Sequence, residues 1–117
     1  MALTTKAVLD KFEAPQKFFV TALLNITPFC DCWGFTTPSI VPDIGIVASD
    51  DIVAAETAAI DLVKAEDFIA GSLPSPLKRS GSGHLFQQIH GKDPYIQVEE
   101  CIKAGLGDRK YKLVQIG

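Results

Sequence analysis

The 117-residue sequence lacks an apolar run long enough to cross a membrane. Its longest run, FFVTALLNI (18–26), has about half of the roughly 20 residues that a membrane-spanning helix requires. The first residues, MALTTKAVLDKF, also lack the uninterrupted apolar core of a signal peptide, because Lys6 and Lys11 interrupt them. We therefore expect a cytoplasmic protein with no membrane partner.

Basic residues are few and scattered. The chain has 11 Lys and Arg against 14 Asp and Glu, a formal net charge of −3, and its adjacent basic residues are Lys78–Arg79 and Arg109–Lys110. A nucleic-acid-binding surface gathers basic side chains on one face, so we predict no nucleic-acid partner. Walker and G-x-G-x-x-G motifs are absent from the sequence, and KRSGSG (78–83) follows no predicted strand, which favours a linker over a phosphate-binding loop.

Cysteine is scarce as well, and two of the three cysteines lie close together in TPFCDCWGF (27–35). A disulfide between Cys30 and Cys32 would be strained, so we expect reduced thiols. In an extended segment, residues two apart point to the same side, and both sulfur atoms could then face one metal ion. Thiolates suit zinc or an iron–sulfur cluster, and either usually takes four ligands. The candidates that would complete the set are Cys101, His84, His90, Asp43, or the same cysteine pair from a second subunit.

Each of these residues also has a structural explanation. Cys30 and Cys32 could be small buried residues that pack beside aromatic neighbours, and Cys101 could be a core residue of a late helix. His84 is then a loop residue, and His90 a solvated histidine at a helix end. The spacing leaves both interpretations open.

Two carboxylates stand in apolar surroundings. Asp43 interrupts an apolar strand, where aspartate is disfavoured, so it either caps the strand end or takes part in chemistry. Glu56 falls outside the polar arc of its helix, so we expect it to lie mostly out of water against the 43–47 segment, unless it snorkels at the edge of the apolar stripe. In Gly45 the missing side chain permits the close approach of another backbone or of a ligand.

The pattern of apolar residues predicts strands separated by helices. Helical spacing or helix-end residues predict four helices: over 2–13, from Ser49–Asp51 to about Ala65, over 84–90, and from Asp93 to Gly105 or Gly107. The runs 17–26 and 39–49 are typical of strands covered on both faces, and 110–116 alternates like a final strand. We predict one α/β domain over 1–117, with a small mixed or mostly parallel sheet of about three or four strands and helices packed on it.

Three segments together resemble a known family: NITPFCDCWG (25–34), PDIGIVASDDIVAAETAAIDLV (42–63) and LFQQIHGKDPYIQVEECIKAGLGDRKYKLVQI (85–116). They are similar to the C-terminal half of an uncharacterised family of iron–sulfur centre proteins, domain-of-unknown-function family three-sixty-two. The resemblance implies a longer architecture, a metal or cluster site that includes Cys30 and Cys32, and a family histidine at His90. The C-x-x-C-x-x-C insert of some members is absent from this sequence, and Glu56 stands where the family usually has aspartate.

Three functional hypotheses follow. The first is a metal or redox role through Cys30 and Cys32. The second is a non-catalytic structural or assembly domain with inert cysteines. The third is an enzyme that uses Asp43 and Glu56 on a small anionic ligand at the helix start near Ser49. Because a small sheet would leave apolar strands uncovered, we also expect either a homo-oligomer or a missing N-terminal half that covers them.

Overall fold

The computed structural model describes residues 1–116, without the side chain of Asp31. The described residues form four α-helices and two strands: α1 (Ala2–Leu9), β1 (Phe19–Leu23), β2 (Gly45–Ser49), α2 (Ile52–Leu62), α3 (Leu85–His90) and α4 (Ile96–Lys103). The chain divides into two compact units. Unit 1 contains Met1–Ala22, Ile46–Asp61 and the described chain from Tyr95 onward, and unit 2 contains Leu23–Gly45 and Leu62–Pro94.

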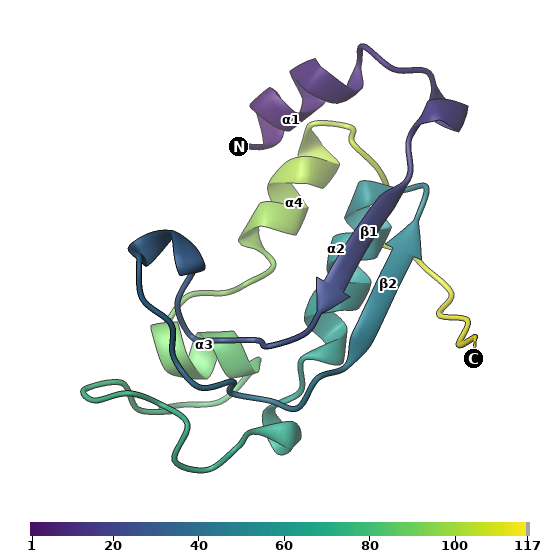
Figure 1. Ribbon diagram of the computed structural model, residues 1–117. Coiled ribbons are helices and arrows are strands. Elements are labelled where there is room, and N and C mark those ends of the chain that lie inside the picture. Colours follow the sequence, from purple (N-terminus) through teal and green to yellow (C-terminus); the bar gives the residue numbers. More distant parts are fainter. Residues whose placement is uncertain (117) are drawn as a thin grey trace. The chain divides into compact units, whose positions relative to one another are not determined.

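β1 and β2 form a two-stranded antiparallel sheet, seen as two arrows of opposite direction in Figure 1. The predicted mixed or mostly parallel sheet of about three or four strands is therefore wrong for the described residues. Each predicted strand run pairs over five residues. Asn25 takes a left-handed conformation just after β1, with φ 49°, and Pro42 has no N–H to donate, so the ladder does not extend through the flanking residues.

The predicted strand 110–116 is not a strand in the structure. Two hydrogen bonds hold Tyr111 and the preceding Asp108 to Asp61 in α2 and to Asp51 just before it, instead of a ladder. The Asp108 N–H donates to Asp51 Oδ2 at 2.9 Å, and the Tyr111 hydroxyl donates to Asp61 Oδ2 at 2.7 Å. We call residues 110–116 the C-terminal tail.

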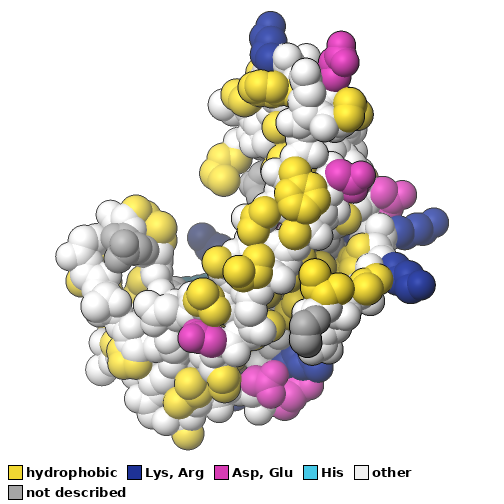
Figure 2. Space-filling model, turned by 45° about the vertical axis from the view of Figure 1, so that its right-hand side comes forward, with side chains coloured by type: hydrophobic (Ala, Val, Ile, Leu, Met, Phe, Trp, Pro, Cys, Tyr) yellow, Lys and Arg dark blue, Asp and Glu magenta, His cyan; other side chains and the backbone are white. Residues whose placement is uncertain are grey.

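One face of the sheet is turned to solvent. The two apolar strand runs had instead predicted that other elements cover both faces. Val47 is buried, whereas Val20 is 62% exposed and Ile46 is 68% exposed. On the covered face α2 lies against the hairpin, and the Thr21 hydroxyl donates to Glu56 Oε1 at 3.3 Å. Hydrophobic side chains also gather at the surface in the view of Figure 2.

α1 and α2 differ in how well the apolar pattern predicts burial. Helical spacing over the predicted helix 2–13 places Leu3, Ala7, Val8 and Phe12 on one apolar face, yet all four are exposed. The helix also ends at Leu9, before the predicted Phe12–Glu13 end. α2 buries a stripe of small residues, Val53, Ala54, Ala55, Ala58 and Ala59.

The start of α2 matches the prediction from Ser49–Asp51. Asp51 Oδ1 accepts the N–H groups of Val53 and Ala54 at 2.7 and 3.0 Å, which caps the helix. Ser49 Oγ accepts the Asp51 N–H at 3.0 Å and so fixes the approach to the cap. The end of α2 is Leu62, a few residues short of the predicted Ala65.

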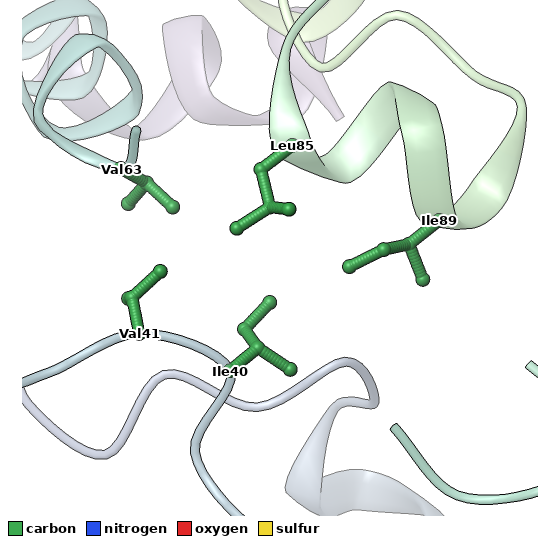
Figure 3. Close-up of a cluster of buried hydrophobic side chains, with 5 residues drawn as sticks. All are labelled: Ile40, Val41, Val63, Leu85 and Ile89. Carbon is green, nitrogen blue, oxygen red and sulfur yellow. The ribbon is translucent and has the colours of Figure 1, made fainter. Parts of the chain in front are cut away.

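Unit 2 has its own hydrophobic core (Figure 3). Leu85 and Ile89 project from α3 toward Val63, which follows α2, and toward Ile40 and Val41 of the segment before β2. Ile40 and Leu85 are completely buried. The predicted short helix 84–90 is confirmed as α3, Leu85–His90. It supplies two of the five central core residues.

No helix in residues 1–116 is long and apolar enough to span a membrane.

Candidate functional site

The cysteine loop, residues 29–35, belongs to unit 2 and contains a short 3-10 helix, Asp31–Trp33. The Cys30 carbonyl oxygen accepts the Trp33 N–H at 3.1 Å, and Cys30 Sγ accepts the Cys32 N–H at 3.4 Å. Cys32 is the middle residue of this 3-10 helix, and Cys30 directly precedes it. The extended segment that we expected is therefore wrong, and strand alternation does not bring the two sulfur atoms to one side.

Both cysteines of the loop are exposed. The interpretation of Cys30 and Cys32 as buried filler is therefore wrong. Phe29 takes the packing role instead: its half-buried ring has centroid distances of 5.6 Å to Phe35 and 6.4 Å to Trp33. Because the aromatic rings pack on one another, the thiols remain at the surface, where exposed cysteines can react or bind metal.

His90 lies beside this loop. It is the last residue of α3, and its ring centroid is 6.2 Å from that of Phe29 in an edge-on arrangement. The side chain is exposed, as expected for a histidine at a helix end. The fold therefore brings His90 near Phe29, the residue before Cys30, although 60 positions separate the histidine from this cysteine in the sequence.

The other proposed ligands are engaged elsewhere. Asp43 Oδ1 accepts the Asn25 N–H at 2.7 Å, so its carboxylate supports the turn after β1. His84 Nδ1 accepts the Phe86 N–H at 3.2 Å and caps α3. Cys101 is half-buried in unit 1, where its sulfur accepts the Gln97 Nε2 at 3.5 Å. Among the side chains that the structure describes, no three His, Cys, Asp or Glu gather as a metal-binding group.

The two carboxylates of the enzyme hypothesis, Asp43 and Glu56, each have another hydrogen-bond partner. Glu56 is exposed, so its predicted burial against 43–47 is wrong. The buried face of α2 is filled by valine, alanine and Thr57, and Glu56 lies at its edge within reach of the Thr21 hydroxyl. Asp43 belongs to unit 2 and Glu56 to unit 1. The first N–H groups of α2 bind Asp51, which leaves them no role in binding an anion.

The glycine at position 45 is explained by its backbone conformation and not by close packing of another backbone against it. A Cβ atom built at Gly45 has no heavy atom of the described residues within 4 Å, so the predicted close approach of another backbone is wrong. Its φ of 137° is one that residues with side chains rarely adopt, which explains glycine at the start of β2.

A polar cluster in unit 1 was not predicted. Asp61, at the end of α2, accepts the hydroxyl groups of Tyr95 and Tyr111 on its two carboxylate oxygens. The Arg109 guanidinium lies over the Tyr95 ring at 4.7 Å and donates to Glu99 Oε1 at 2.7 Å. Asp61 is 34 residues from Tyr95 and 50 residues from Tyr111 in the sequence, and no motif connects them.

The electrostatics of this cluster follow from its geometry. Burial, together with the hydrogen bond to Asp61, raises the pKa of Tyr95 to about 12. The hydrogen bond to Asp61, followed by burial, raises the pKa of Tyr111 to about 12. Both phenols therefore stay protonated far above neutral pH and remain hydrogen-bond donors to Asp61.

The loop 78–83 is held by one residue of α3. Gln88 Oε1 accepts Arg79 Nε and Nη2 at 2.9 and 2.7 Å, and Gln88 Nε2 donates to the Gly83 carbonyl at 2.7 Å. The Arg79 guanidinium also lies over the Phe68 ring at 4.6 Å. Arg79 therefore has a structural role, and the loop shows no arrangement suited to phosphate.

Comparison with known proteins adds no relative. A scan against protein-family models finds no match to the chain, and neither curated proteins nor solved structures match it. The resemblance to iron–sulfur centre proteins therefore stays a prediction, and the site is interpreted from its own residues.

Proposed function

We propose that Cys30 and Cys32 form half of a thiolate site for a soft metal, which the same pair of a second copy of the chain completes. The observation that carries this proposal is the exposure of both cysteines on one short turn. A structural role in the core would place them inside, as expected for inert cysteines. A metal that joins two copies requires thiols at the surface.

The chemistry of the donor set supports a shared site over a site within one chain. Zinc takes four nitrogen or sulfur ligands in a structural site, and a 4Fe–4S cluster takes four thiolates. The chain has three cysteines, and Cys101 belongs to the other unit. One chain therefore does not fit a four-thiolate cluster, whereas two copies of the Cys30–Cys32 pair supply four thiolates. Zinc would crosslink the copies, and an iron–sulfur cluster would add electron transfer.

The surroundings of the pair are suited to such a site. The Cys32 N–H donates to Cys30 Sγ, and hydrogen bonds of this kind stabilise ligating thiolates and tune the metal that they hold. Trp33 and Phe35 are exposed beside the cysteines. A second copy that covers these rings would remove apolar surface from water and shield the metal.

Cobalt(II) titration under reducing, anaerobic conditions tests the proposal. Co²⁺ bound by thiolates gives sulfur-to-cobalt charge-transfer absorption, which zinc should then abolish by displacing the cobalt. We expect saturation at one metal per two chains in the wild type. Cys30→Ser and Cys32→Ser should each remove this absorption, whereas Cys101→Ser, the matched control, should retain it. Equal loss in all three variants, or no absorption in the wild type, would contradict a Cys30–Cys32 site.

A second candidate function is a non-catalytic assembly domain with inert cysteines. The observation that favours it is the open face of the sheet, where Phe18, Val20 and Ile46 are all more than half exposed. Such a face is typical of a surface that another chain covers. Sedimentation velocity in the presence of a chelator separates the two candidates. A metal-free dimer that Ile46→Glu dissociates would favour the assembly domain, and a metal-dependent dimer that Cys30→Ser dissociates would favour the thiolate site.

A further inference from the structure

A cavity of about 320 Å³ lies between β2, α2 and the C-terminal tail, within unit 1. The tail passes on the side of β2 that faces away from β1 (Figure 1). Residues 46–49 form one wall of the cavity and residues 111–114 another. Because β2 pairs with β1 on its other edge, this wall is the open edge of a two-stranded sheet.

Most of the residues that line the cavity are apolar, and one is charged. Ala55 and Ala58 of α2 supply a floor of small side chains, and Val47 and Leu113 supply larger apolar ones. Lys112 is the one charged residue among those that line the cavity, and it makes no ion pair within residues 1–116. Ser49 contributes a hydroxyl group whose oxygen accepts the Asp51 N–H, which leaves its proton able to donate.

We propose that this cavity binds a small carboxylate with an apolar body, of the size of a medium-chain fatty acid. The volume is at the lower end of the range for ligand pockets. At about 30 Å³ for each water-sized group, a cavity of 320 Å³ holds roughly ten non-hydrogen atoms. Octanoate has this number. Its chain would lie on the alanine floor, and its carboxylate would accept from Lys112 and the Ser49 hydroxyl.

The charge of the site decides between a carboxylate and a cation or a neutral ligand. The lining contains no Asp or Glu among the described residues. The nearby Asp61 carboxylate is occupied by the hydroxyl groups of Tyr95 and Tyr111. Octanoate would therefore place its carboxylate near Lys112, away from the Asp61 end of the tail, because like charges repel.

Octanoate titration, followed by the backbone amide signals in two-dimensional NMR, tests the proposal. We expect saturable shifts confined to residues 46–49, 54–58 and 111–114, with a dissociation constant on the order of 1 mM or below. Lys112→Gln should weaken octanoate binding roughly threefold to fivefold, the size expected for an exposed ion pair. Lys110→Gln, a matched removal of charge from a residue that does not line the cavity, should leave binding unchanged. 1-Octanol should bind wild type and Lys112→Gln equally.

A variant that fills the cavity gives an independent measurement. Ala58→Met should abolish the octanoate shifts while the far-ultraviolet circular dichroism stays that of the wild type; if this variant fails to fold, the two lysine variants decide. Shifts that do not saturate, shifts centred on the open face around Val20, or an unchanged affinity in Lys112→Gln would overturn the proposal. None of these results depends on Cys30 or Cys32, so the outcome is separate from that of the metal site.

Discussion

Removal of the Asp51 carboxylate should destabilise the protein more than any other single change to an exposed or half-buried side chain considered above. Asp51 Oδ1 caps α2 through two N–H groups, and Oδ2 accepts the Asp108 N–H that fixes the start of the C-terminal tail. Loss of the cap costs about 1 kcal/mol, and loss of a hydrogen bond to a charged group costs about 1.5 kcal/mol. Asp51→Ala should therefore lower the free energy of unfolding by about 2 to 3 kcal/mol, or Tm by roughly 10 °C.

Urea unfolding monitored by circular dichroism measures this change, and two variants control it. Asp50→Ala removes an exposed carboxylate one residue earlier and should change stability by less than about 0.5 kcal/mol. Asp51→Asn keeps an oxygen that caps the helix and should cost about half as much as Asp51→Ala. If Asp51→Ala and Asp50→Ala are equally stable, the link between α2 and the tail does not contribute as the structure implies.

Three further predictions concern other contacts. The pKa of Tyr95 and of Tyr111 is about 12 in the folded protein and about 10 when unfolded. The resulting stabilisation is complete below pH 10 and is lost as pH rises toward 12. Because the chain has two tyrosines, tyrosinate absorbance reports this directly, and Asp61→Asn should move the titration toward pH 10; a wild-type midpoint near 10 would contradict it. Gln88→Ala should lower stability by about 1 to 2 kcal/mol and speed amide hydrogen exchange in the 79–83 loop; unchanged exchange would show that Gln88 does not hold it. Asp43→Ala should cost about 1 kcal/mol through loss of the hydrogen bond to the Asn25 N–H, and a neutral result in urea unfolding would show that this turn does not need it.

Local signals in the sequence predicted the helices better than the sheet. Asp51 lies directly before α2 and needs no distant partner to cap it, and Gly105, with φ 73°, follows the end of α4 as predicted. A strand depends on a partner elsewhere in the chain. The run 110–116 alternates like a strand, but Tyr111 bonds to Asp61, 50 residues away, and the segment does not join the sheet.

The apolar pattern also did not show which faces are covered. Leu3 and Ile46 are in sequence contexts typical of buried residues, yet both are more than two-thirds exposed. Apolar residues predict a core only where another element is present to cover them, and the short sheet leaves one face open. For the same reason Glu56 was misplaced: its position on the helix was predicted, but not what lies opposite.

The candidate site was predicted in part. The Cys30–Cys32 spacing drew attention to the loop, but the 3-10 turn and the packing of Phe29 against His90 arise from contacts that the spacing does not encode. The Asp61 cluster joins three separate segments, so it had no sequence signal at all.

Native mass spectrometry of the reduced protein with Zn²⁺ is the decisive measurement for the shared Cys30–Cys32 site, because it counts metal ions and chains in one particle. We expect a dimer that carries one zinc ion, and monomers for Cys30→Ser and Cys32→Ser under the same conditions, with Cys101→Ser still forming the zinc-bound dimer. A wild-type monomer without zinc, or a zinc-bound dimer that persists when both Cys30 and Cys32 are replaced by serine, would contradict it.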